Sequence, residues 1–215
     1  MEIDKNKIYG LEEALEAMKA TPAAKFDESV EIHVRLGINP KKTEQNVKGS
    51  VVLPHGTGKT KRVAAFVAES KIKEAKDAGA DVVGGIELIE EIKKSGKCDF
   101  DVAVAEPDIM KDMAQIARVL GPRGLMPSPK NETVTKDIAR VIGEVKGGKV
   151  SFKNDDSGNL HQVVGKLSWD AAKLNENITA FLDTLKKLRP AGVKGSFVKA
   201  ITICSSMGKG INIAV

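Results

Sequence analysis

The sequence predicts a mixed α/β protein with a first α+β domain, an antiparallel sheet with helices, built from both ends of the chain. Residues 29–36 alternate polar and apolar side chains, as a half-buried strand does. Residues 63–146 alternate short apolar runs with helical patterns, which is typical of βαβ units. From residue 149 onward, short strand patterns separated by turns again predict antiparallel strands. These three observations together predict a second domain inserted into the first.

The composition is that of a folded, mildly basic chain. Of its 215 residues, 41% are hydrophobic, and the formal net charge is +5. That small excess is as typical of a solvated surface as of nucleic-acid binding. Aromatic residues make up only 4%, which argues against a base-stacking platform. Cys98 and Cys204 are isolated, and no stretch approaches the roughly 20 apolar residues of a membrane span, so we expect a reduced, cytoplasmic setting.

The N-terminal part is predicted to hold one helix and two paired strands. Leu11, Leu15 and Met18 have helical spacing and place a helix over 11–18. The strand that follows has an apolar and a polar face, made respectively by Val30, Ile32, Val34 and Leu36 and by Ser29, Glu31, His33 and Arg35. A second apolar run at 51–53 is interpreted as its antiparallel partner.

The middle of the chain is predicted to alternate strands and helices. Strands are expected at 63–67, 81–83 and 100–105, and helices at 70–78, 86–94, 108–120 and 134–146. Three prolines exclude regular structure from 121–130, which we expect to be a stiff loop.

The C-terminal part is predicted to return to antiparallel structure. Residues 150–153 and 160–166 are interpreted as a hairpin around the turn 154–159. A helix is expected over 171–189, with one apolar face formed by Leu174, Ile178, Phe181, Leu182 and Leu185. Strands are expected at 197–204 and 211–215.

These elements predict the domain boundaries. Residues 1–56 and 149–215 form a discontinuous first domain, and residues 57–148 form an inserted Rossmann-like α/β domain. The chain crosses between them at glycines, which would let the domains open and close about a hinge. The predicted hinge residues are Gly56, Gly58, Gly147 and Gly148.

No motif of an enzyme is complete in this sequence. Gly56-Thr57-Gly58-Lys59-Thr60 suggests a phosphate-binding loop, but the first glycine of that motif is replaced by Leu53. The inserted block has no GxGxxG after a strand. The three histidines lack metal-ligand spacing, and no serine or cysteine is paired with one of them. We therefore predict no catalytic residue, no metal and no cofactor; a nucleotide-dependent enzyme remains the competing class.

The remaining polar positions suit a protein that contacts the phosphate and sugar groups of a nucleic acid. Hydroxyls, amides and lysines contact phosphates and 2′-hydroxyls, and folded RNA is recognised largely through its shape and these groups. The candidates are Lys25, Ser29, Lys153, Asn154, His161, Lys166, Ser168, Ser205 and Ser206. Asp27, Glu28 and Glu31 lie among them, so this is not a purely basic patch, and a plain solvated face stays open as the alternative.

Several segments carry a resemblance to a known family. They are Phe26-Asp27-Glu28-Ser29-Val30-Glu31, Leu36-Gly37-Ile38, Gln45-Asn46-Val47-Lys48-Gly49, Leu53-Pro54-His55-Gly56-Thr57-Gly58-Lys59, Gly121-Pro122-Arg123-Gly124-Leu125-Met126-Pro127, Asn154-Asp155, Gly158, His161, Gly165-Lys166 and Ser205-Ser206-Met207-Gly208. The chain closely resembles the bacterial ribosomal protein L1 family over nearly its whole length.

That resemblance implies a fold, a function and partners. It implies two domains joined by a flexible hinge, and a non-enzymatic protein, monomeric when free, that binds large-subunit rRNA in the mobile stalk of the ribosome beside the tRNA exit site. The other implied partners are the rest of the large subunit, exit-site tRNA, which leaves deacylated, and the messenger RNA of the protein's own operon, whose translation many members repress. A scaffold without this repression is an open alternative. No membrane partner is implied.

The family's RNA contacts are carried over residue by residue. They fall on Phe26, Ser29, Glu31, His161, Ser168, Ser206, Met207 and Gly208, next to Ser205, with Lys25, Lys48, Lys153 and Lys166 as phosphate partners. Arg123, in the proline-rich loop, is the candidate for a secondary RNA contact.

The chain departs from the family pattern at three places. Relatives usually have two threonines where this chain has Ser205-Ser206, which keeps the hydroxyls and removes two methyl groups. Lys209 stands where a small residue or proline is common. The sequence lacks the basic N-terminal extension that many relatives carry, so we expect either that any RNA contact made there is missing or that the chain is trimmed.

Overall fold

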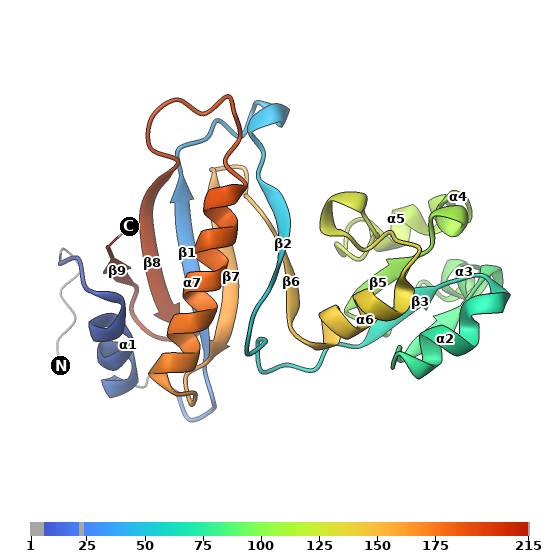
Figure 1. Cartoon of the computed structure of the whole chain (residues 1–215), viewed down its shortest axis with the longest axis horizontal. Coiled ribbons are helices and arrows are strands. Elements are labelled where there is room, and N and C mark those ends of the chain that lie inside the picture. The colour runs from blue at the N-terminus through green and yellow to red at the C-terminus, as the bar shows by residue number, and fades with distance from the viewer. Residues whose placement is uncertain (1–6, 22–23, 215) are drawn as a thin grey trace. The chain divides into compact units, whose positions relative to one another are not determined.

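The structure, a computed structural model, describes residues 7–21 and 24–214 (Figure 1). Its contacts divide the chain into two compact units, Met1–Gly58 with Val150–Val215, and Lys59–Lys149. Each unit has its own hydrophobic core. The chain is thus a mixed α/β protein with an antiparallel sheet and helices, as the sequence predicted.

The first unit is organised around a four-stranded antiparallel sheet in the order β7-β1-β8-β9. The strands are β1 (Ser29–Leu36), β7 (Asn159–Lys166), β8 (Val198–Ser205) and β9 (Ile211–Ile213). His33, in the middle of β1, lies opposite His161 on β7 and Thr202 on β8. The predicted alternation along β1 is confirmed, because its apolar residues from Val30 to Leu36 are buried while Glu31 and His33 stay partly open to solvent.

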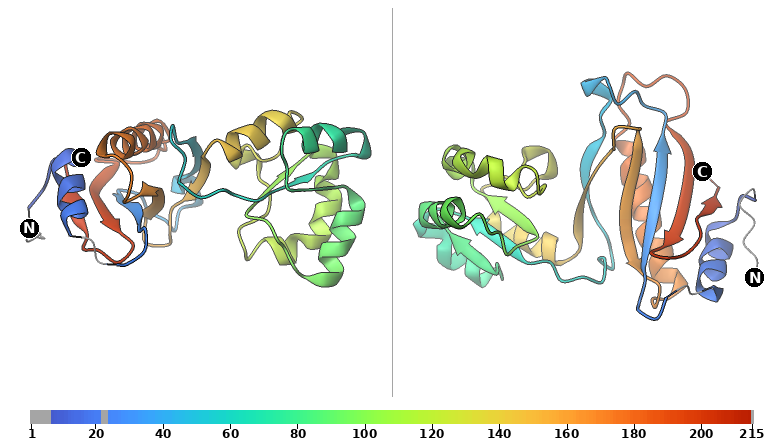
Figure 2. Two further views of the ribbon diagram at one scale, coloured as in Figure 1. Left: turned by 90° about the horizontal axis from the view of Figure 1, so that it is seen from below. Right: turned by 180° about the vertical axis from the view of Figure 1, so that it is seen from behind.

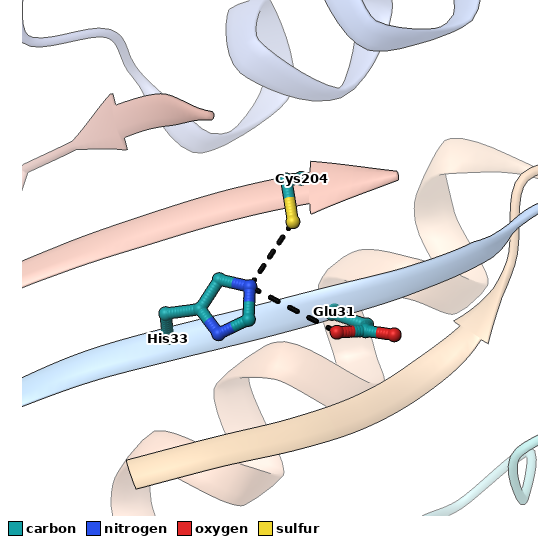
Figure 3. A group of neighbouring side chains, drawn as sticks. All are labelled: Glu31, His33 and Cys204. Carbon is teal, nitrogen blue, oxygen red and sulfur yellow. Dashed lines mark hydrogen bonds and ion pairs between the residues drawn. The ribbon is translucent and has the colours of Figure 1, made fainter. Parts of the chain in front are cut away.

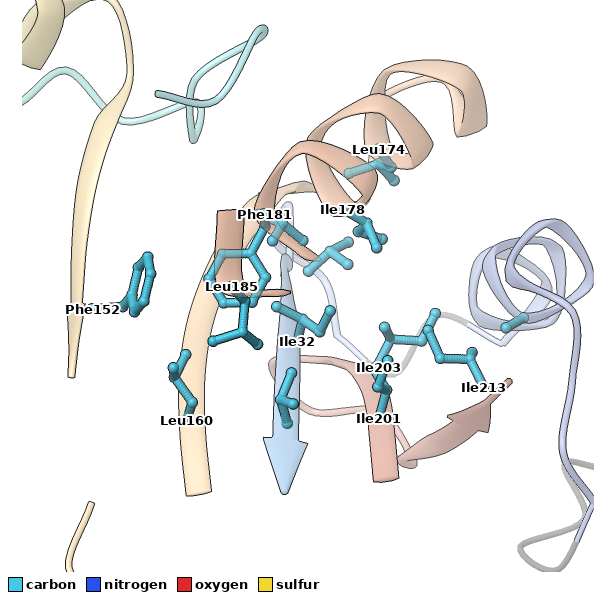
Figure 4. Close-up of a cluster of buried hydrophobic side chains, with 14 of the residues drawn as sticks. Ile32, Phe152, Leu160, Leu174, Ile178, Phe181, Leu185, Ile201, Ile203 and Ile213 are labelled. Atoms are coloured by element: carbon cyan, nitrogen blue, oxygen red, sulfur yellow. The ribbon is translucent and has the colours of Figure 1, made fainter. Parts of the chain in front are cut away.

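One face of this sheet is covered by the long helix α7 (Ala171–Lys187), and α1 (Leu11–Ala20) packs beside it near β9. The predicted apolar stripe of α7 is confirmed: Leu174, Ile178, Phe181 and Leu185 are fully buried against the sheet (Figure 4). The fifth residue, Leu182, is partly buried. The ring of Phe181 packs edge-on against Phe152 at 5.3 Å between centroids. Figure 2 shows the opposite face of the sheet, which no helix of the described residues covers.

A separate two-stranded sheet pairs β2 (Lys48–Val52) with β6 (Lys149–Lys153). Two predicted pairings are therefore wrong. β2 does not pair with β1, and β6 forms no hairpin with β7, because β1 takes β7 and β8 as its two neighbours.

Asn154 explains why the predicted hairpin separates into two sheets. Its side chain is buried, its Oδ1 accepts the Val47 N–H at 2.7 Å, and its own N–H donates to the Val47 carbonyl at 3.0 Å. The end of β6 is thereby held to the segment before β2. Asp155 then closes the turn by accepting the N–H of Asn159 at 2.6 Å, where β7 begins.

The second unit is a parallel sheet covered on both faces. Its strands are β3 (Val63–Phe66), β4 (Val82–Gly84) and β5 (Val102–Ala105), in the order β4-β3-β5. The helices α2 (Ile72–Asp77) and α6 (Ile138–Lys146) pack on one face, and α3 (Ile86–Ser95), α4 (Met110–Met113) and α5 (Ala117–Leu120) on the other. Every residue of β3 is buried, as expected of a parallel strand between two helical layers.

Two predicted helices of this unit differ in detail. The helix expected at 108–120 is divided into α4 and α5 by a 3₁₀ turn, Ala114–Ile116, although Ile109, Met113, Ile116 and Leu120 all remain buried. Helix α6 begins at Ile138 rather than at residue 134, because Thr133 and Thr135 exchange backbone hydrogen bonds with Ala105 and extend the sheet instead.

The remaining short elements are 3₁₀ turns. They are Thr43–Gln45, Glu69–Lys71, Pro107–Ile109 and Pro129–Asn131. Within the described residues, none of the helices has the length and apolar character that crossing a membrane requires.

Candidate nucleic-acid interface

Three loops meet at the end of the four-stranded sheet where β1 begins: residues 24–28, 167–169 and 206–210. A buried carboxylate holds two of them together. Glu28 is completely buried, and its two oxygens accept the backbone N–H groups of Ala24 and Met207, each at 3.0 Å. The Glu28 carbonyl accepts the N–H of Leu167 at 2.8 Å, which adds the third loop. Charge-assisted bonds of this kind are about twice as strong as neutral ones, so Glu28 fixes the local backbone.

The turn after β8 is fastened to the start of β1 by serines. Ser29 donates its N–H to the Ser206 hydroxyl oxygen at 3.1 Å, and Ser206 donates its own N–H to the Ser29 carbonyl at 3.1 Å. Ser205 is buried beneath the turn, and Gly208 approaches it so closely that a Cβ there would lie 2.3 Å from the Ser205 hydroxyl oxygen. Any other residue at position 208 would require the Ser205 side chain or the turn to move.

A second clamp joins the loop before β1 to the loop after β7. Asp27 accepts both the N–H and the hydroxyl of Ser168, at 3.2 and 3.1 Å. Lys166 donates to the Asp27 carbonyl at 3.0 Å. These bonds hold the two loops together, although Ser168 itself is exposed to solvent.

Two large apolar side chains project from these loops into solvent. Phe26 is 60% exposed and Met207 is 68% exposed, whereas Glu28 between them in the network is fully buried. Exposed apolar side chains that gather in a patch are typical of a surface that contacts another molecule, and Phe26 and Met207 are the exposed large apolar side chains of these three loops. Lys25 is exposed on the same loop as Phe26.

The uncovered face of the sheet adds a row of polar groups. His33 Nδ1 lies 2.7 Å from His161 Nδ1, and His33 Nε2 lies 3.0 Å from Cys204 Sγ and 3.9 Å from a Glu31 oxygen (Figure 3). His161 Nε2 is 3.5 Å from Asp155. Burial, followed by the neighbouring His161, lowers the pKa of His33, and burial, followed by Glu31, raises the pKa of Cys204. The thiol is thus kept protonated and is no activated nucleophile.

Glu31, His33 and Cys204 are also the one set of possible metal ligands that the described residues bring together. Their ligand atoms lie within 4.8 Å of one another. Sequence spacing gave no sign of this set and predicted no metal.

The structure does not gather all the predicted RNA-binding residues in one place. Lys48 and Lys153 lie on β2 and β6, next to the Val47–Asn154 bonds, and so toward the opposite end of β1 from Phe26. A strand rises about 3.3 Å per residue, so nearly the whole length of β1 separates these two lysines from Phe26. Arg123 is exposed in the second unit, where the chain turns from Leu120 to Leu125.

The predicted hinge glycines have different backbone conformations. Gly56, Gly58 and Gly148 have positive φ, which favours glycine, whereas Gly147 is helical at the end of α6. A Cβ on Gly58 would meet Lys166 at 2.8 Å, so this glycine also serves close packing in the first unit. The segment 56–60 leads into β3 without a helix, so it lacks the helix N-terminus on which a phosphate-binding loop depends.

Residues 17–209 match the family described as "Ribosomal protein L1p/L10e family". The chain belongs to this family. It is 49% identical over 211 residues to "Large ribosomal subunit protein uL1" of Kosmotoga olearia, covering 98% of this chain and 91% of the relative. It is 50% identical over 211 residues to the protein of the same description from Fervidobacterium nodosum, covering 98% and 90%. As a member of the L1p/L10e family, the chain is a ribosomal protein and not an enzyme.

Proposed function

We propose that this chain is a structural constituent of the large ribosomal subunit in the cytoplasm and that it binds the stalk region of large-subunit rRNA through its first unit. Membership of the L1p/L10e family and the description of its relatives support the ribosomal assignment. The ordered loops at the start of β1 support the placement of the RNA contact.

The observation that carries this proposal is the exposure of Phe26 and Met207 on loops that Glu28 and Ser206 hold rigid. Binding to a preformed surface costs less conformational entropy than binding to loops that must first be ordered. An exposed ring can stack on an unpaired base, and the neighbouring serines and backbone can read 2′-hydroxyls. The whole arrangement suits recognition of RNA shape by a few fixed contacts.

The two units have different roles in this proposal. The discontinuous unit is the RNA-binding domain, and the parallel-sheet unit is an inserted Rossmann-like domain that adds a secondary contact through Arg123. The glycines at 56, 58, 147 and 148 form the hinge. As a monomer when free, the protein would also bind its own operon's messenger RNA and would assist release of deacylated tRNA from the ribosome.

The proposal is tested by measuring binding to a folded stalk-region rRNA fragment and to an unrelated duplex of equal length. We expect tight binding of the fragment only. Phe26→Ala should weaken it by about 5- to 150-fold, since stacking of a base on an aromatic ring contributes about 1–3 kcal/mol. Met207→Ala should change affinity in the same direction, because it removes the other exposed apolar side chain of these loops.

Ile86→Ala is the matched control, because Ile86 is an equally exposed apolar residue of the second unit, at 58%. It should leave affinity unchanged. Equal, salt-sensitive binding of both RNAs, unaffected by Phe26→Ala and Met207→Ala, would show that only net positive charge is at work.

A further inference from the structure

The uncovered face of the four-stranded sheet holds three metal-ligating side chains of different chemistry. Glu31 and His33 are two residues apart on β1 and so point to the same side, and Cys204 lies opposite Glu31 on β8. Figure 3 shows the three side chains converging from the two strands. The cysteine comes 171 residues after His33, and only the pairing of β1 with β8 brings it there.

This set is built on rigid backbone. The central strand β1 has a hydrogen-bonded neighbour on each side, and α7 packs beneath it. All three side chains are partly buried, and those of His33 and Glu31 are 30% and 35% exposed. The ligand atoms are therefore preorganised and still accessible to an ion from solvent.

Two further residues orient His33. Its Nδ1 lies 2.7 Å from His161 Nδ1, and His161 Nε2 lies 3.5 Å from Asp155. In the tautomers that fit these contacts, His33 carries its proton on Nδ1 and donates it to His161, and His161 carries its proton on Nε2, which faces Asp155. The lone pair on Nε2 of His33 is then directed at Cys204 and Glu31. A histidine that ligates a metal commonly has such a chain of outer partners on its other nitrogen.

We propose that Glu31, His33 and Cys204 bind one transition-metal ion, with Zn²⁺ the best fit, and that His161 and Asp155 are positioning residues for His33. One sulfur, one nitrogen and one oxygen suit zinc, whereas Mg²⁺ and Ca²⁺ prefer oxygen alone. The ion takes the place of the Cys204 thiol proton, which is released to solvent. The thiolate and carboxylate then balance its two positive charges, and water completes the tetrahedron.

The geometry needs only small side-chain movements. Zinc–nitrogen and zinc–sulfur bonds of about 2.0 and 2.3 Å in a tetrahedron separate those two ligand atoms by about 3.5 Å. His33 Nε2 and Cys204 Sγ are now 3.0 Å apart, and Glu31 is 3.9 Å from the same nitrogen. The sulfur must move out by about half an ångström and the carboxylate must move in by about as much.

The test is calorimetric titration of the reduced, metal-free protein with Zn²⁺, together with absorption spectroscopy of its Co²⁺ form. We expect one site and, with Co²⁺, the intense visible bands of a tetrahedral ion plus a thiolate-to-cobalt charge-transfer band. Cys204→Ser should abolish that band, and both Cys204→Ser and His33→Gln should weaken Zn²⁺ binding by more than the roughly 10–100-fold that loss of an outer partner costs.

Matched controls distinguish this site from adventitious binding. Cys98→Ser changes the other cysteine, which lies in the second unit, and His55→Gln changes a histidine paired with Glu176. Both should leave affinity and spectrum unchanged. His161→Gln should keep the charge-transfer band while weakening affinity about 10–100-fold, as loss of an outer partner does.

Three results would overturn the proposal. They are Zn²⁺ affinity that is the same in the parent and in Cys204→Ser, a cobalt spectrum without thiolate ligation, and a charge-transfer band removed by Cys98→Ser instead. If Cys204→Ser does not fold, the decision rests on the parent's cobalt spectrum and on His33→Gln, with circular dichroism to verify folding.

Discussion

At the scale of single residues, the molecule places a buried charge where the sequence shows only a polar run. Glu28 stands between Asp27 and Ser29, and nothing in the run Asp-Glu-Ser separates a structural carboxylate from an exposed one. Its role follows from burial and from the two N–H groups that it accepts. The exposed neighbours Phe26 and Met207 owe their positions to it.

Glu28→Gln should lower the free energy of unfolding of the first unit by about 1–3 kcal/mol. The amide retains the shape, but its single oxygen cannot replace both acceptors, and a buried N–H left without a partner costs about that much. The measurement is urea unfolding followed by fluorescence of Trp169, the chain's only tryptophan, which packs in this unit. Glu16→Gln, an exposed position of α1, is the control. Equal unfolding midpoints for both variants would contradict the role assigned to Glu28.

The chemistry of the uncovered sheet face could be predicted only in part. The alternation along β1 places Glu31 and His33 on the polar side, and that is visible in the sequence. Their approach to Cys204 and His161 depends on the registers of β1 with β8 and β7. Register is a property of long-range pairing, so spacing along the chain could not reveal it.

At the scale of elements, periodicity predicted what each segment is and which side it buries. Strand β1 and helix α7 lie within two residues of their expected bounds, because their apolar side chains repeat cleanly. Periodicity does not say which strand a strand pairs with. The partners of β1 come more than 120 residues later in the chain, and the buried Asn154 that separates β6 from β7 looks like any turn residue in the sequence.

Helix α6 offers a prediction at this scale. Gly143 lies inside Ile138–Lys146, and a Cβ built on it would meet no atom within 4 Å. Alanine is favoured over glycine inside a helix by about 0.5–1 kcal/mol. Gly143→Ala should therefore stabilise the second unit by about that amount, measured by amide hydrogen exchange of β3. Gly84→Ala, whose Cβ would lie 2.6 Å from Leu88, should instead destabilise it. A loss of stability in Gly143→Ala would mean that the exposed side of α6 is not as open as described.

At the scale of the whole molecule, the buried polar side chains of the two units have different partners. In the first unit, Glu28 and Asn154 accept backbone N–H groups, whereas in the second Glu106 and Lys149 take part in ion pairs. Glu106, a buried residue, lies 2.9 Å from Lys71, and Glu144 lies 2.8 Å from Lys149. The hydrogen bond from Lys71 lowers the pKa of Glu106, and the one from Lys149 lowers the pKa of Glu144. The second unit should therefore lose stability in acid through these two pairs.

The sign of that sensitivity follows from linkage. A carboxylate whose pKa is lower in the folded protein adds stability above its ordinary value, here 4.5, and the stability is lost as the pH falls from there through the folded pKa. We expect amide exchange in β3 to accelerate over that window. Glu106→Gln should be less stable than the parent at neutral pH and should show a shallower acid loss, because the partner that Lys71 holds at 2.9 Å no longer titrates. Glu91→Gln, on the exposed side of α3, should follow the parent throughout. Parallel acid profiles for the parent and Glu106→Gln would show that the Lys71 pair contributes nothing to acid sensitivity, and the second unit would then have to lose its structure through other carboxylates.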